Sequence, residues 1–188
     1  CCCWGDRGSG SGASWAAVVL VDVTPRLEFQ GARRVVTFMA AHPDGFSTLS
    51  DAAEVIAAYN PHRSRPANVD GLRKVLRQRH DGRWIWRWDP AFIHSNFDFL
   101  RDESTTGTEQ FDAISHLLID GARRVNAPTL LVRGLLSDVV SQATVDEFKQ
   151  LVPHAETVDV SGTGHMIAGD DNDAFGCAVT EFLGRNLL

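Results

Sequence analysis

The sequence has no apolar run close to the roughly 20 residues that a helix needs to cross a membrane. It shows no signal peptide at its start and no basic cluster that would offset its formal net charge of −6. We therefore expect neither a membrane nor a nucleic acid as a partner. The expected location is cytoplasmic, and the sequence leaves the oligomeric state open.

Cysteine is scarce, with four residues in a chain of 188. Three of them are consecutive, at positions 1–3, and adjacent cysteines without a second cluster form neither a zinc site nor a disulfide framework. The fourth, Cys177, falls in an apolar pattern and is predicted to be a small buried residue. The sequence therefore predicts no metal and no cofactor.

What the sequence does contain is the composition of a globular domain, 44% apolar and 22% charged, in a length that can bury a core. Residues 1–14 lack periodicity and are rich in glycine and serine, which is typical of a disordered linker or an artefactual leader. The pattern then changes to Val-Val-Leu-Val-Asp-Val at 18–23, a buried-strand run that is closed by Thr24, Pro25 and Arg26.

The most informative stretch is 127–165, which predicts a strand–helix–strand unit. Residues 127–134 form an unbroken apolar run with a proline at its start and a glycine at its end, as in a parallel strand with both faces buried. Val145, Phe148 and Leu151 recur at helical spacing. A second strand is expected at 155–160. Strands joined by a crossover helix are parallel, so the loops that follow them lie at the same sheet edge, where α/β proteins place their ligand sites.

Each of these two loops carries a residue with catalytic chemistry. Asp138 follows the first strand, and His165 follows the second in Gly-Thr-Gly-His-Met at 162–166. A carboxylate that accepts the Nδ1–H of an imidazole fixes its tautomer and leaves Nε2 to take a proton from a nucleophile. We therefore expect Asp138 to orient His165.

These motifs resemble the carboxyl-terminal part of the α/β-hydrolase fold, in which the nucleophile, the acid and the histidine follow in that order. By resemblance, Asp138 matches the triad acid and His165 matches the triad base. The implied fold class is α/β, with the last parallel strands of a doubly wound sheet and an inserted helical cap. Residues 15–26 and 126–188 would belong to the core and residues 27–125 to the cap.

The resemblance also implies a Gly-x-Ser-x-Gly nucleophile elbow on a buried strand, and the sequence does not contain one. The motif fails at Ser9, Ser11 and Ser14 because a flanking glycine is missing in each case. We therefore expect the chain to lack its nucleophile segment and to be inactive alone. Whether residues 1–14 are a frameshift or a true sequence stays open.

The segment 27–125 carries helical patterns over residues 31–42, after Thr48 with Asp51 in a capping-box position, after Asn68, and over 110–124. These helices resemble the cap of epoxide-hydrolase-like and haloperoxidase-like members of the family. Such a cap roofs the catalytic edge, excludes water and lines the substrate pocket.

Within this segment, Trp84, Trp86 and Trp88 stand at every second position and would share one side of an extended stretch. They could form an aromatic wall over an apolar substrate, with Met166 as a further contact, or they could pin the cap to the main domain. Stacking on a single-stranded nucleic acid is a weaker alternative, because it depends on two arginines in an acidic chain.

The expected function is that of a hydrolase for an ester or a related small apolar substrate, with a serine nucleophile. Epoxide hydrolases of this fold use an aspartate nucleophile and typically two cap tyrosines, and Tyr59 is the one tyrosine of the chain, which argues against that chemistry. The nucleophile, serine or aspartate, stays open. The alternative is a non-catalytic domain that binds a small molecule, or a degenerate hydrolase fragment.

Overall fold

The computed structural model describes residues 15–61, 69–101, 107–167 and 173–187. The leader at 1–14 and the expected helix cap Asn68 lie outside the described residues. The chain forms two compact units, one made of residues 1–31 and 108–188, the other of residues 32–107. The sequence analysis had placed the boundaries of the core and the cap at 26 and 126, and that division stays a prediction. Most of the helix before residue 126 lies in the first unit.

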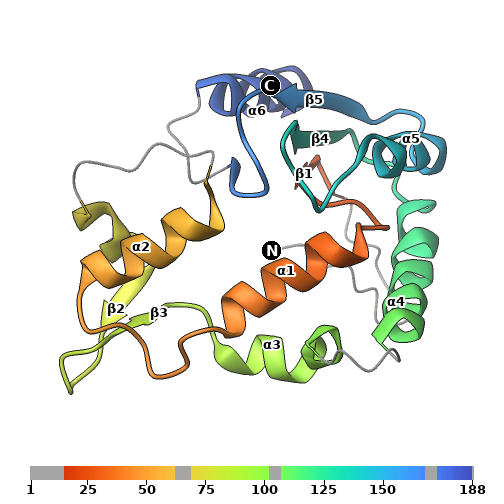
Figure 1. The fold of residues 1–188 in the computed structure, drawn as a ribbon. Helices are drawn as coiled ribbons and strands as arrows, with labels where there is room; N and C mark the ends of the chain where they lie inside the picture. The colour runs from red at the N-terminus through yellow and green to blue at the C-terminus, as the bar shows by residue number, and fades with distance from the viewer. Residues whose placement is uncertain (1–14, 62–68, 102–106, 168–172, 188) are drawn as a thin grey trace. The chain divides into compact units, whose positions relative to one another are not determined.

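The first unit contains a parallel sheet with the strand order β1-β4-β5 (Figure 1). The strands are β1 (Val18–Val21), β4 (Thr129–Gly134) and β5 (Glu156–Val160). Every residue of the central strand β4 is buried, as the unbroken apolar run predicts. Its one charged residue, Arg133, is buried beside β5, where the guanidinium donates hydrogen bonds of 2.9 and 2.8 Å to Asp159.

Helices α5 (Gln142–Leu151) and α6 (Asp173–Leu187) accompany this sheet. Ser141 caps α5 by accepting a hydrogen bond from the Thr144 amide. The core on the α6 side of the sheet joins Phe182 to buried residues of β4 and β5 and of the segment after β5, namely Leu130, Val132, Val160 and Ile167. Cys177 is exposed on α6, so the prediction that it is buried is wrong. It belongs to the solvent face of a helix whose apolar pattern is carried by its neighbours.

Helix α4 (Gly107–Ala122) leads into the chain that forms β4. Its Phe111 packs edge-to-face on Phe29 at the start of helix α1 (Phe29–Ala40), with ring centroids 5.3 Å apart. Arg26, just after β1, pairs with Glu147 of α5 at 3.1 Å and with Asp112 of α4 at 3.7 Å. These contacts hold the segment after β1 within the first unit.

The second unit contains the rest of α1 and helix α2 (Leu49–Tyr59). Thr48 and Asp51 form the expected capping box, with each side chain bonded to the other residue's amide. Two short segments for which the sequence analysis made no prediction are helical: α3 (Pro90–Asn96), which Asp89 caps, and the 3-10 helix η2 (Asp98–Leu100).

The prediction of a helix after Asn68 is wrong. The chain there forms a 3-10 helix η1 (Asp70–Lys74) and then an antiparallel hairpin of β2 (Leu76–Gln78) and β3 (Trp84–Trp86). The chain reverses direction between β2 and β3 at a turn that contains Gly82. This residue has a φ of 85°, which glycine adopts without steric cost, so the turn favours a hairpin over a continuous helix. Asp81 in this turn accepts a hydrogen bond from Arg79, which lowers the pKa of the carboxyl group to about 2.

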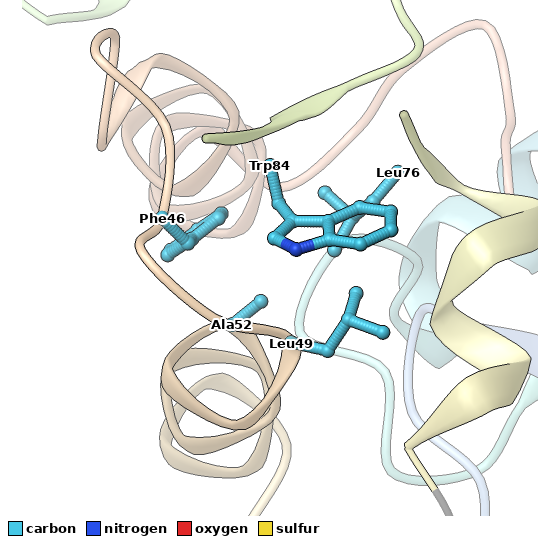
Figure 2. Packing of buried hydrophobic residues seen from close by; sticks show 5 residues of the cluster. All are labelled: Phe46, Leu49, Ala52, Leu76 and Trp84. Carbon is cyan, nitrogen blue, oxygen red and sulfur yellow. The ribbon is translucent and has the colours of Figure 1, made fainter. Parts of the chain in front are cut away.

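The three tryptophans take part in the packing of this second unit. Trp84 is buried in a cluster with Phe46, Leu49, Ala52 and Leu76 (Figure 2). Trp86 packs against the same cluster and stacks on Trp88, with ring centroids 4.2 Å apart. The side that the tryptophans of β3 share is therefore a core of the unit itself.

Candidate functional site

The residue at the centre of the site is Asp22, the first residue after β1. Its side chain is fully buried, and its amide donates to the carbonyl of Val132 at 2.7 Å, which extends the pairing of β1 with β4 by one residue. Its φ of 49° lies in the left-handed region, which aspartate tolerates better than most residues. The left-handed residue turns the chain out of the strand one position after the last strand residue, at the carboxyl edge of the sheet.

Three donors surround the carboxylate of Asp22. The Gly134 amide donates to Oδ1 at 3.0 Å, the Ser137 hydroxyl donates to Oδ2 at 2.5 Å, and Nδ1 of His165 lies 2.8 Å from the same Oδ2. A buried carboxylate is costly unless it is hydrogen-bonded and paired. These contacts meet the first condition, and His165 meets the second when its ring takes up a proton.

His165 reaches Asp22 from the loop that follows β5. Gly162 turns this loop with a φ of 73°, and the Thr163 hydroxyl donates to the Val160 carbonyl at 3.1 Å. The Leu136 amide donates to the Thr163 carbonyl at 2.9 Å, which fixes the loop against the end of β4. The contact is so close that a Cβ atom at Gly134 would lie 2.6 Å from the Thr163 carbonyl oxygen.

The hydrogen bonds decide which ring nitrogen of His165 carries a proton. The amides of Val139 and Val140 both donate a hydrogen bond to Ser137 Oγ. The hydroxyl hydrogen of Ser137 is therefore free to be donated to Asp22. The Asp22 carboxylate then acts as an acceptor, and Nδ1 of His165 donates to it. Nε2 is left to accept a proton, and the side chain as a whole is 29% exposed.

The carboxylate that contacts Nδ1 of His165 in the structure belongs to Asp22, whereas the sequence analysis had expected Asp138 there. Asp138 is exposed, and its backbone carbonyl lies against Gly31 at the start of α1. Both aspartates follow parallel strands and reach the same sheet edge, so strand order alone does not distinguish them. The available signal was the aspartate inside the run at 18–23, which the sequence analysis had treated as part of a buried strand.

The remaining candidate residues are Met166 and the three tryptophans Trp84, Trp86 and Trp88. Met166 follows His165 and is half-buried. Trp84, Trp86 and Trp88 belong to the second unit, where they pack as described above. Contact of these four residues with a substrate stays a prediction.

Two further findings concern the described residues alone. Within them, no group of three or more His, Cys, Asp and Glu side chains is arranged to hold a metal ion. The helices of the same residues include none that is both long and apolar enough to span a bilayer.

Solved hydrolases share this architecture. The structure of E-2-(acetamidomethylene)succinate hydrolase matches 90% of this chain with a TM-score of 0.69 and 21% identity, and the matched region is 57% of that protein. An α/β hydrolase from Novosphingobium aromaticivorans matches 90% of the chain with a TM-score of 0.63 and 22% identity, again over 57% of its own length. The chain has part of the α/β-hydrolase fold. The prediction of this fold class from the motifs is therefore confirmed.

The hydrolase-fold chain is also similar in sequence to esterase Rv0045c of Mycobacterium tuberculosis, with 26% identity over 159 residues. This alignment covers 81% of the chain and 47% of the esterase, so the chain spans about half the length of this relative. The solved structure of that esterase matches 90% of the chain with a TM-score of 0.58. No family model matches the sequence.

Proposed function

We propose that this chain carries the acid and the base of an ester-hydrolase site, with Asp22 as the acid and His165 as the base. The observation that carries the proposal is the 2.8 Å contact between Asp22 Oδ2 and His165 Nδ1, made by a fully buried carboxylate at the carboxyl edge of the sheet. Asp138, the acid expected from the sequence, has no part in the proposed pair.

In this role Asp22 holds the ring with Nδ1 protonated and Nε2 free. Nε2 takes the proton of an attacking hydroxyl group, and the imidazolium that results is stabilised by the carboxylate next to it. Burial strengthens this stabilisation, because few water molecules compete for the carboxylate. His165 then returns the proton to the leaving group.

An ester is the substrate class that we favour, since the chain is similar to an esterase. Leu135 and Leu136 follow Gly134 and are about half exposed, at 52% and 49%. The amide of Leu136 is bonded to the loop that carries His165, so these two apolar residues belong to the same edge of the sheet. They favour a small apolar substrate, and they would equally suit a non-catalytic domain that binds such a molecule.

The acid and the base also need a nucleophile, and we assign none in this chain. Ser137 is close to Asp22, but its hydroxyl hydrogen is directed to the carboxylate on the Nδ1 side of the ring, so it does not serve Nε2. The sequence has no Gly-x-Ser-x-Gly elbow. We therefore propose that the 188-residue chain alone does not hydrolyse esters.

Whether Asp22 or Asp138 is the acid is tested by 15N NMR of the His165 ring in the original chain and in one asparagine variant of each aspartate. Asp22→Asn is expected to change the tautomer and to abolish the Nδ1–H signal of the bonded imidazole, because an amide nitrogen can replace the acceptor oxygen. Asp138→Asn, the matched control, is expected to leave the ring spectrum as in the original chain. The proposal is contradicted when the Asp138 variant changes the spectrum and the Asp22 variant does not.

The expected inactivity is tested with a chromogenic short-chain ester. The chain and its His165→Ala variant should give the same rate, equal to the rate in buffer, because removal of a triad nucleophile costs about six orders of magnitude in turnover. A rate that disappears in the His165→Ala variant would show that a nucleophile is present. Circular dichroism of both proteins serves as the folding control.

A further inference from the structure

The Ser137 hydroxyl donates to the same oxygen of Asp22, Oδ2, that accepts the Nδ1–H of His165. We propose that Ser137 is a positioning residue that limits how much of the Asp22 charge acts on His165 and keeps the carboxylate from rotating. The inference deepens the proposed function and rests on it, because it matters for catalysis only when His165 is the base.

The turn after β4 holds the carboxylate at both of its oxygens. The Ser137 amide donates to the Gly134 carbonyl at 3.0 Å, which closes the turn over residues 134–137. The first residue of this turn donates its amide to Oδ1 of Asp22, and the last residue donates its hydroxyl to Oδ2. A carboxylate held in this way cannot rotate without breaking a hydrogen bond in a buried place.

The direction of the Ser137 hydroxyl is set by its surroundings. A hydroxyl oxygen accepts two hydrogen bonds, and both positions are taken by the amides of Val139 at 3.1 Å and Val140 at 3.2 Å. These two valines are buried, so their amides need this partner. The single hydrogen of the hydroxyl is therefore committed to Asp22.

Two donors on one oxygen share its negative charge. When Ser137 donates to Oδ2, the hydrogen bond from His165 meets a weaker acceptor than it would alone, and the imidazolium is stabilised less. A less stabilised imidazolium gives up the proton on Nε2 more readily. Removal of the hydroxyl should therefore strengthen the hydrogen bond between His165 and Asp22, whereas a residue that merely supports the loop would weaken it when removed.

The experiment measures the Nδ1–H proton resonance of His165 in the 188-residue chain by 1H NMR. Ser137→Ala is expected to move this resonance downfield, because Oδ2 then has one donor. Ser137→Thr keeps the hydroxyl and is expected to restore the original position. Ser141→Ala, a matched control that removes a helix-capping serine of the same segment, is expected to leave the resonance in place.

A resonance that stays in place, moves upfield or disappears in a folded Ser137→Ala chain would overturn the proposal. If that variant does not fold, Ser137→Cys decides, because a thiol is a weaker donor and should give a downfield shift in the same direction. Failure of the proposed function is distinguishable from this outcome. In that case the original chain itself would lack the Nδ1–H resonance, or would keep it in the Asp22→Asn variant.

Discussion

Gly134→Ala is expected to destabilise the first unit by about 3 kcal/mol or more, at or beyond the upper end of the cost of inserting one carbon into a packed site. The added Cβ would lie 2.6 Å from the Thr163 carbonyl oxygen and also against the Gly164 carbonyl. Both contacts are with backbone atoms, so no side chain can move aside to relieve them. Urea unfolding followed by circular dichroism measures the loss.

The same substitution should also separate His165 from Asp22, since the loop that would be displaced carries His165. Gly164→Ala is the matched control, because a Cβ there meets its nearest neighbour, the Leu136 carbonyl oxygen, at an ordinary 3.7 Å. That variant should lose little stability and keep the Nδ1–H resonance. Equal losses in the two variants would mean that the close approach at Gly134 does not hold the site together.

Phe182→Ala is expected to cost about 3–5 kcal/mol of unfolding free energy, the usual cost of removing a phenyl ring from a core. Phe182 is 1% exposed and lies among Leu130, Val132 and Val160, so the cavity would open beneath the central strand of the sheet. Denaturant unfolding of the chain gives the value.

Cys177→Ala on the same helix is the control for this variant. Cys177 is exposed, so its replacement should change the unfolding free energy by less than about 0.5 kcal/mol. A large loss from Cys177→Ala, or a negligible one from Phe182→Ala, would mean that α6 packs on the sheet through its other face.

Much of the architecture follows from local patterns. The apolar run at 127–134 predicts a buried parallel strand, and the spacing of Val145 and Phe148 predicts the crossover helix, because both depend on residues close together in the chain. The capping box of Thr48 and Asp51 is likewise a local signal. The hairpin of β2 and β3 was missed because apolar spacing over residues 69–76 suits a helix as well as a 3-10 turn followed by a strand.

The sequence by itself determined that a histidine and an aspartate meet at the carboxyl edge of a parallel α/β sheet, since strand order and connection handedness place both kinds of loop there. Only the tertiary structure decided which aspartate meets the histidine. His165 bonds to a residue 143 positions away, and no local pattern reports such a contact. Gly134 lacks a side chain, so the histidine loop lies directly on the end of β4 and reaches Asp22, whereas the turn that follows carries Asp138 toward Gly31.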